Sequence, residues 1–141
     1  MLNMWADGEL KGLCDAFFRE TQGLLTWSWD EQLLAVLAQF SVNDRDKVFG
    51  ILGPFMGAKW DESEIEKAPE IVRQLAENMG GLRSGQFLFT TDASKNVFIF
   101  GAWWPWQDDQ TISLRVGPHW AESSDSESDD FMASFKACFG L

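Results

Sequence analysis

The sequence is poor in the side chains that bind metals or act as nucleophiles. It has no tyrosine, one histidine (His119) and two cysteines, Cys14 and Cys138. A single histidine cannot build the usual histidine-rich zinc sites, and no Cys-x-x-Cys pair replaces them. Catalysis by a Cys14–His119 dyad would need an orienting third group, which the spacing does not supply. We therefore expect no catalytic residue, no metal site and no cofactor, which argues against an enzyme but leaves the question open.

Basic residues are also scarce. The chain has 11 Lys and Arg against 22 Asp and Glu, which gives a net charge of -11 at pH 7. A chain with this charge repels phosphate backbones and anionic lipid surfaces. We expect no nucleic-acid partner and no membrane binding, and instead a protein partner with a basic surface.

Long hydrophobic runs are absent as well. The longest, over residues 97–104, has the length of a strand, whereas a membrane span needs about 18 residues. Residues 1–9 contain no basic side chain, unlike the start of a signal peptide. Two isolated cysteines on apolar segments are typical of reduced core thiols. These features predict a cytoplasmic protein.

The first half of the chain has helical periodicity. Apolar residues recur at spacings of three and four, which predicts amphipathic helices. Ser28 or Asp30 would cap the second of these helices, and Pro54 would limit the third. The expected helices cover four segments: 10–18, 33–40, 48–52 and 71–79.

The second half of the chain alternates with the period of a strand. Residues 87–91, 97–104 and 111–116 are separated by turn residues, which predicts an antiparallel meander. Residues 121–130 hold five acids and four serines, a composition typical of a solvated, flexible loop. Helical spacing returns over 131–139.

These patterns predict a single α+β domain over residues 1–141. Four N-terminal helices would pack on a three-stranded antiparallel meander, and a short C-terminal helix would close the chain. Phe and Trp together make up 14% of the residues, which is too aromatic for a disordered chain.

Tryptophan is concentrated in two places. In Trp103-Trp104-Pro105-Trp106, the indoles cannot all face one core, because side chains alternate across a strand. Exposed aromatic clusters mark interaction sites, although these rings could also form a lid folded back on the sheet. The predicted partner-binding residues are this cluster, two acids that follow it and two earlier tryptophans: Trp103, Trp104, Trp106, Asp108, Asp109, Trp27 and Trp29.

Two classes of function fit this sequence. The leading prediction is a non-enzymatic, acidic protein-binding module, such as an immunity-type inhibitor, a secretion chaperone or an adaptor, with aromatic anchors and an acidic rim. The alternative is a small-ligand or carbohydrate-binding domain, or a weak hydrolase, with a Trp/Asp pocket near residues 103–109 that includes a buried acid. A nucleic-acid mimic ranks third, and a homodimer remains open.

Overall fold

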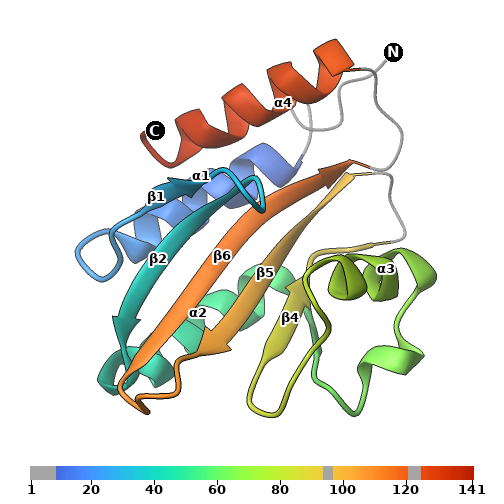
Figure 1. Cartoon of the computed structure of the whole chain (residues 1–141). Coiled ribbons are helices and arrows are strands. Elements are labelled where there is room, and N and C mark those ends of the chain that lie inside the picture. The colour runs from blue at the N-terminus through green and yellow to red at the C-terminus, as the bar shows by residue number, and fades with distance from the viewer. Residues whose placement is uncertain (1–8, 94–96, 121–124) are drawn as a thin grey trace.

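The computed structural model describes residues 9–93, 97–120 and 125–141. In this part of the chain, six strands form one antiparallel sheet, curled into a half-barrel, in the order β1-β2-β6-β5-β4-β3 (Figure 1). The strands are β1 (Ser28–Asp30), β2 (Ala35–Ser41), β3 (Ala58–Trp60), β4 (Phe87–Thr90), β5 (Val97–Pro105) and β6 (Thr111–Trp120). The helices are α1 (Glu9–Thr21), α2 (Arg45–Met56), α3 (Glu70–Asn78) and α4 (Asp125–Cys138), with 3-10 turns η1 (Val42–Asp44) and η2 (Ile65–Lys67).

The expected architecture of four N-terminal helices on a three-stranded meander is wrong. The meander itself is present as β4, β5 and β6, but β2 pairs with β6 and β3 pairs with β4, so the sheet grows at both edges. Only three of the four expected N-terminal helices form, as α1, α2 and α3. In the described chain, six strands therefore outnumber the four α-helices, and the sheet is the centre of the fold.

The predicted helix over 33–40 is instead the second half of the β1–β2 hairpin. Asp30 does not cap a helix: its Oδ1 accepts hydrogen bonds from Gln32 N (2.9 Å) and Leu33 N (3.5 Å), which closes a turn. Leu34 has a φ of 52° and so turns the chain into β2. Burial then alternates along β2. The sequence could not decide this, because a short apolar run fits a helix and a buried strand equally well.

Two helix ends also differ from expectation. Pro54 lies inside α2, which continues to Met56 and ends at Gly57, whose φ is 91° and whose N–H donates to Gly53 O. Pro54 has no N–H to donate to Gly50 O, so α2 continues through this position with one helical hydrogen bond missing. Helix α4 begins at Asp125, within the segment expected to be a loop, while residues 121–124 lie outside the described residues.

Strand β5 is buried on both faces and makes the sheet the centre of two cores. On one face, Val97, Ile99 and Trp103 pack in a cluster with residues of α1, α2 and α4. We call this the covered face; α1 and α2 lie behind the sheet in Figure 1. Helix side chains in this cluster are Cys14, Phe17, Val48, Leu52, Met56 and Phe135.

The second face is covered only in part. Helix α3 lies in front of the β4 side of the sheet (Figure 1) and packs Val72 and Leu75 against Phe98 and Phe100 of β5. The β1–β2 turn covers a second region, because Leu34 O lies close to Gly117 of β6. Beyond these two covers, toward the β5–β6 turn, no helix of the described chain crosses β2, β6 and the end of β5 (Figure 1).

Gly117 is required by the close approach of the β1–β2 turn and Phe100. A Cβ at this position would lie 2.8 Å from Phe100 Cζ and 3.0 Å from Leu34 O. We expect Gly117→Ala to lower the free energy of unfolding by about 1–3 kcal/mol, the cost of overpacking a filled core. Urea denaturation measures this difference.

The matched control is Gly50→Ala in α2, where an added Cβ meets nothing within 4 Å. This change should raise the free energy of unfolding by up to about 1 kcal/mol, because alanine favours the helix. Equal effects of the two substitutions would contradict the packing described at Gly117.

Candidate functional site

The structure divides the tryptophan cluster between the two faces of the sheet. Trp103 lies on the covered face, is 1% exposed and contacts Phe49 edge-on at 4.7 Å between ring centroids. Trp104, the next residue along β5, points to the second face and is half-buried. The alternation argument is confirmed for these two residues, and Trp103 is a core residue rather than a surface anchor.

Trp104 makes a cation–π contact with Arg115 of the neighbouring strand. The Arg115 Cζ atom lies 5.1 Å from the Trp104 ring centroid. Arg115 Nε also donates to Asp30 Oδ2 over 2.6 Å, and the two side chains are only 21% and 12% exposed. This triad joins the consecutive strands β5 and β6 to β1, because Asp30 lies 85 residues before Arg115 in the sequence.

The triad lies in the uncovered part of the second face. We call this part the open face and define it by Leu37, Gln39, Trp104, Ser113 and Arg115. Register places them together, because Arg115 pairs with Leu37 on one side and Ser113 pairs with Gln39 and Trp104 on its two sides. Gln39 is exposed, Ser113 is buried, and the other three are half-buried.

One indole N–H of this surface has no acceptor. Trp104 Nε1 is buried and has no hydrogen-bond partner among the described residues, and the same holds for Trp60 Nε1 on β3. A buried donor without an acceptor costs about 1–3 kcal/mol. The open face therefore carries a polar group that the described residues leave unsatisfied.

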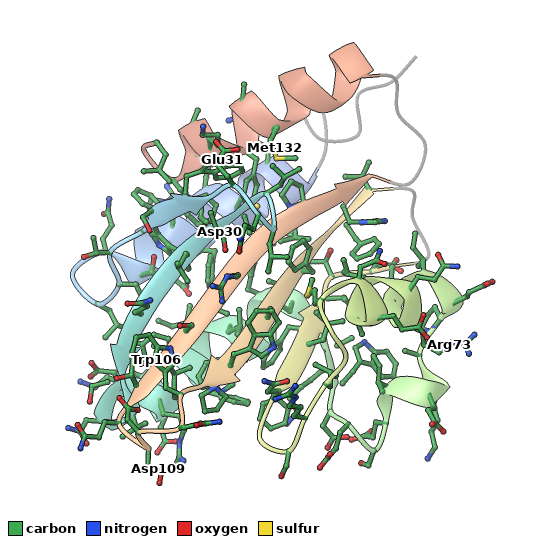
Figure 2. The ribbon with its side chains drawn as sticks, viewed as in Figure 1. Asp30, Glu31, Arg73, Trp106, Asp109 and Met132 are labelled. Atoms are coloured by element: carbon green, nitrogen blue, oxygen red, sulfur yellow. The ribbon has the colours of Figure 1, made fainter. Side chains whose placement is uncertain are left out.

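Trp106 lies at the end of the open face, on the turn between β5 and β6 (Figure 2). Its indole is 44% exposed, and its Nε1 donates to Ser113 Oγ over 2.7 Å. The hydrogen bond fixes the ring over β6 and leaves part of it accessible. Trp106 is thus an exposed aromatic residue held in one orientation.

The two acids after the cluster have different positions in the same turn. Asp108 Oδ1 accepts from the N–H groups of Gln110 (2.9 Å) and Thr111 (3.0 Å). These bonds lower the pKa of Asp108 below its usual value, and the bond from Gln110 is the largest cause. Through the same bonds, the carboxylate closes the turn. Asp109, with a φ of 58°, is exposed at the tip (Figure 2).

Trp27 and Trp29 lie on the covered-face side of the sheet, opposite the open face. Trp27 is 8% exposed, and its Nε1 donates to Thr21 Oγ1 over 3.1 Å. Trp29 packs against the covered-face core and lies under Lys136 of α4, with Nζ 4.7 Å from the ring centroid. Neither is brought together with Trp104 or Trp106.

A pocket lined in part by Trp106 opens at the end of the sheet that carries the β5–β6 turn. We call it the end pocket. Its volume is about 440 Å³, and its walls come from α2, β4 and the β5–β6 turn. Buried or half-buried apolar residues and the rim of the turn line it: Val42, Phe49, Phe87, Trp103, Pro105, Trp106 and Ile112, with Arg45, Asp109 and Thr111 as polar neighbours. The expected pocket near 103–109 is present, but Asp109 is exposed and is not the buried acid of the alternative hypothesis.

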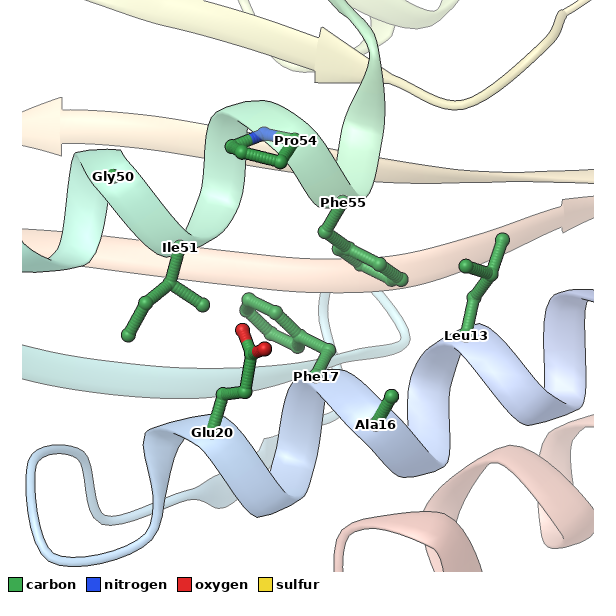
Figure 3. A pocket seen from close by; sticks show the side chains of 8 residues that line it. All are labelled: Leu13, Ala16, Phe17, Glu20, Gly50, Ile51, Pro54 and Phe55. Carbon is green, nitrogen blue, oxygen red and sulfur yellow. The ribbon is translucent and has the colours of Figure 1, made fainter.

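A second, smaller depression lies between α1 and α2. Figure 3 shows side chains of the two helices facing each other across it, and its volume is about 300 Å³. Phe17 and Phe55, which both line it, stack with 4.5 Å between ring centroids. Leu13, on α1, is 39% exposed at its edge.

The thiols and the histidine do not form a reactive pair. Cys14 is buried in the covered-face core, whereas His119 contacts Phe98 of the second face at 5.0 Å between ring centroids. Burial raises the pKa of Cys14. Burial is also the largest cause at Cys138, and the hydrogen bond to Asp15 is the second; they raise the pKa of Cys138 to about 11. The sheet thus separates Cys14 from His119, and both thiols stay protonated near neutral pH.

No family model, curated protein or solved structure matches the chain. Among the described residues, no three His, Cys, Asp or Glu side chains come together in a group that could hold a metal ion. No helix in the described ranges is both long and apolar enough to cross a bilayer.

The sequence alone did not identify Arg115 and Leu37 as residues of the open face, or Asp30 as the partner of Arg115. The sequence predicts Ser28 or Asp30 as a helix cap, because such a residue before an apolar run favours a helix N-terminus. Arg115 lies in the alternating segment 111–116, where a single basic residue among apolar ones indicates a position facing away from the core. That signal was available, but only the register of β2, β6 and β5 places Arg115 beside Trp104.

The Asp30–Arg115 pair should stabilise the fold. We expect Asp30→Asn to lower the free energy of unfolding by about 1–3 kcal/mol, because Arg115 keeps a half-buried charge and loses its carboxylate partner. Urea denaturation at neutral pH measures the change. Asp46→Asn is the matched control, because Asp46 is 93% exposed in its contact with Arg45, and such pairs contribute little.

The same pair predicts a pH dependence. Burial raises the pKa of Asp30, but the hydrogen bonds from Arg115 and Gln32 outweigh it and hold that pKa below its usual value. The stabilisation should therefore be complete above about pH 5 and disappear as the pH falls below about 4 through the folded-state pKa. A difference between wild type and Asp30→Asn that stays constant down to about pH 2 would contradict this assignment.

Proposed function

We propose that this protein is a non-enzymatic binding module whose open face docks a protein partner with a basic surface. The observation that carries the proposal is the composition of that face. Where the described chain provides no helix to cover the sheet, it presents Trp104 in a cation–π contact with Arg115, with Trp106 at one end. Tryptophan and arginine are enriched among the residues that dominate binding energy at protein interfaces.

The geometry of these residues supports docking rather than simple coverage of the sheet. Trp106 is held by Ser113, and Arg115 is held by Asp30, so both side chains lose little conformational entropy on binding. Trp104 Nε1 is a buried donor without an acceptor in the described chain. A partner that repacks this surface can supply the acceptor and recover the cost of the unsatisfied group.

A strained residue at the edge of the open face also supports docking at this surface. Leu34 has a φ of 52° and is 46% exposed. For a leucine, this left-handed backbone conformation costs about 1–2 kcal/mol, and the exposed side chain recovers only part of its burial energy. Strained residues of this kind cluster at functional sites, and Leu34 would contact a partner that lies over β2 and β6.

The charge of the protein favours a basic partner. The net charge is -11, and exposed acids flank the open face, with Glu31 near one end and Asp109 near the other (Figure 2). Acids at the rim of an interface steer a basic partner and raise the association rate, and salt weakens this effect. The proposal therefore includes faster association at low ionic strength.

The double variant Trp104→Ala, Trp106→Ala should lose the partner. We expect affinity for the protein enriched from native lysate to fall by at least about tenfold, because two aromatic anchors are removed. Pull-down followed by titration with the identified partner measures this. Trp29→Ala is the matched control, because Trp29 lies under α4, away from the open face. Full retention by the double variant, or equal loss by Trp29→Ala, would show that another surface binds.

Leu34→Gly separates binding from stability. Glycine relieves the left-handed backbone, so the free energy of unfolding should change by no more than about 0.5 kcal/mol, whereas affinity for the same partner should fall. Leu13→Gly is the comparison at another exposed leucine: it should destabilise α1 and leave the affinity unchanged. Unchanged binding by Leu34→Gly would remove this residue from the proposed interface.

A further inference from the structure

The end pocket is separate from the open face and has its own chemistry. Trp106 borders both, but the pocket extends to the covered-face side of the sheet, where Phe49, Phe87 and Trp103 form its walls. Its volume of about 440 Å³ lies in the range of small-molecule sites. We propose that the end pocket binds a small aromatic carboxylate, with the ring against these walls and the carboxylate near Arg45.

The walls suit a flat aromatic ring. Phe49 contacts Trp103 edge-on at 4.7 Å and Phe87 edge-on at 5.7 Å, so these three rings are already locked against one another. Edge-to-face contact is a favoured arrangement for aromatic pairs. A ring that enters the pocket meets preformed aromatic surfaces, and the pocket does not need to reorganise to receive it.

Two cations lie beside these walls in a protein with a net charge of -11. Arg45, in the first turn of α2, lines the pocket. Lys59 Nζ lies 5.3 Å from the centroid of Phe49 and 5.1 Å from that of Phe87, two of the lining rings. The positive end of the α2 dipole adds to this local field. An anionic group on the ligand is therefore favoured here.

The acids near the pocket do not cancel these cations. Arg45 Nε lies 3.5 Å from Asp46 Oδ1, but the side chains are 60% and 93% exposed, so this pair is weak and can yield to a ligand. Asp109 lines the pocket from the β5–β6 turn and is exposed, so solvent and salt screen its charge as they screen that of Arg45. A bidentate arginine–carboxylate contact can compete with both.

A neutral sugar fits the same lining less well. A sugar ring carries hydroxyl groups on most of its edge, and each hydroxyl that faces Phe49, Phe87 or Ile112 would lose its hydrogen bonds to water. An aromatic carboxylate places its polar atoms at one end only. The distribution of apolar walls and one cationic rim thus favours the amphipathic anion.

Calorimetric titration of the full chain with 2-naphthoate, 2-naphthamide and glucose tests the proposal. We expect 2-naphthoate to bind at least about fivefold more tightly than the neutral amide, because only the carboxylate gains the charge-assisted contact. Glucose should not compete. In NMR spectra, the indole N–H signal of Trp106, assigned with Trp106→Phe, should shift on addition of 2-naphthoate.

Arg45→Gln, Lys59→Gln should abolish the preference for the carboxylate over the amide. The matched control, Lys67→Gln, Arg73→Gln, removes the same charge from exposed positions at η2 and α3 and should retain the preference. The proposal is overturned if 2-naphthoate does not bind, if the amide binds equally well, if glucose binds more tightly, or if the control loses the preference as well. None of these outcomes depends on a protein partner.

Discussion

The fold depends on the burial of β5 on both faces. A strand whose alternate side chains are all apolar needs a layer on each side of the sheet. Helices α1, α2 and α4 supply one layer, and on the other side α3 and the β1–β2 turn meet over Phe98 and Phe100. In the part of the chain that the structure describes, these two covers do not extend to the end of β5, where Trp104 lies (Figure 1).

The chain covers this remaining area with side chains of the sheet itself. Trp104, Arg115 and Asp30 come from three different strands and shield the backbone where a helix would otherwise lie. Such coverage is thinner than a helix and leaves the indole and the guanidinium accessible from outside. The same arrangement that completes the second face therefore produces the surface that we propose for docking.

Part of this could be predicted from the sequence. The meander of β4, β5 and β6, the positions of α1 and α3, and the separation of Trp103 from Trp104 follow from side-chain periodicity, which is a local property. The β1–β2 hairpin does not follow, because the apolar run 33–37 fits either period and only pairing with β6 makes it a strand. The contact between Asp30 and Arg115 spans 85 residues, and no local pattern encodes it.

The most direct test of the central claim places a photo-crosslinking residue on the open face. Gln39 is exposed on β2 beside Ser113, and Gln74 is exposed on α3. With p-benzoylphenylalanine at either position in the native host, the account predicts that irradiation links position 39 to one basic protein and leaves position 74 without that adduct. No adduct from position 39, or the same adduct from both positions, would contradict the assignment of the open face as the docking surface.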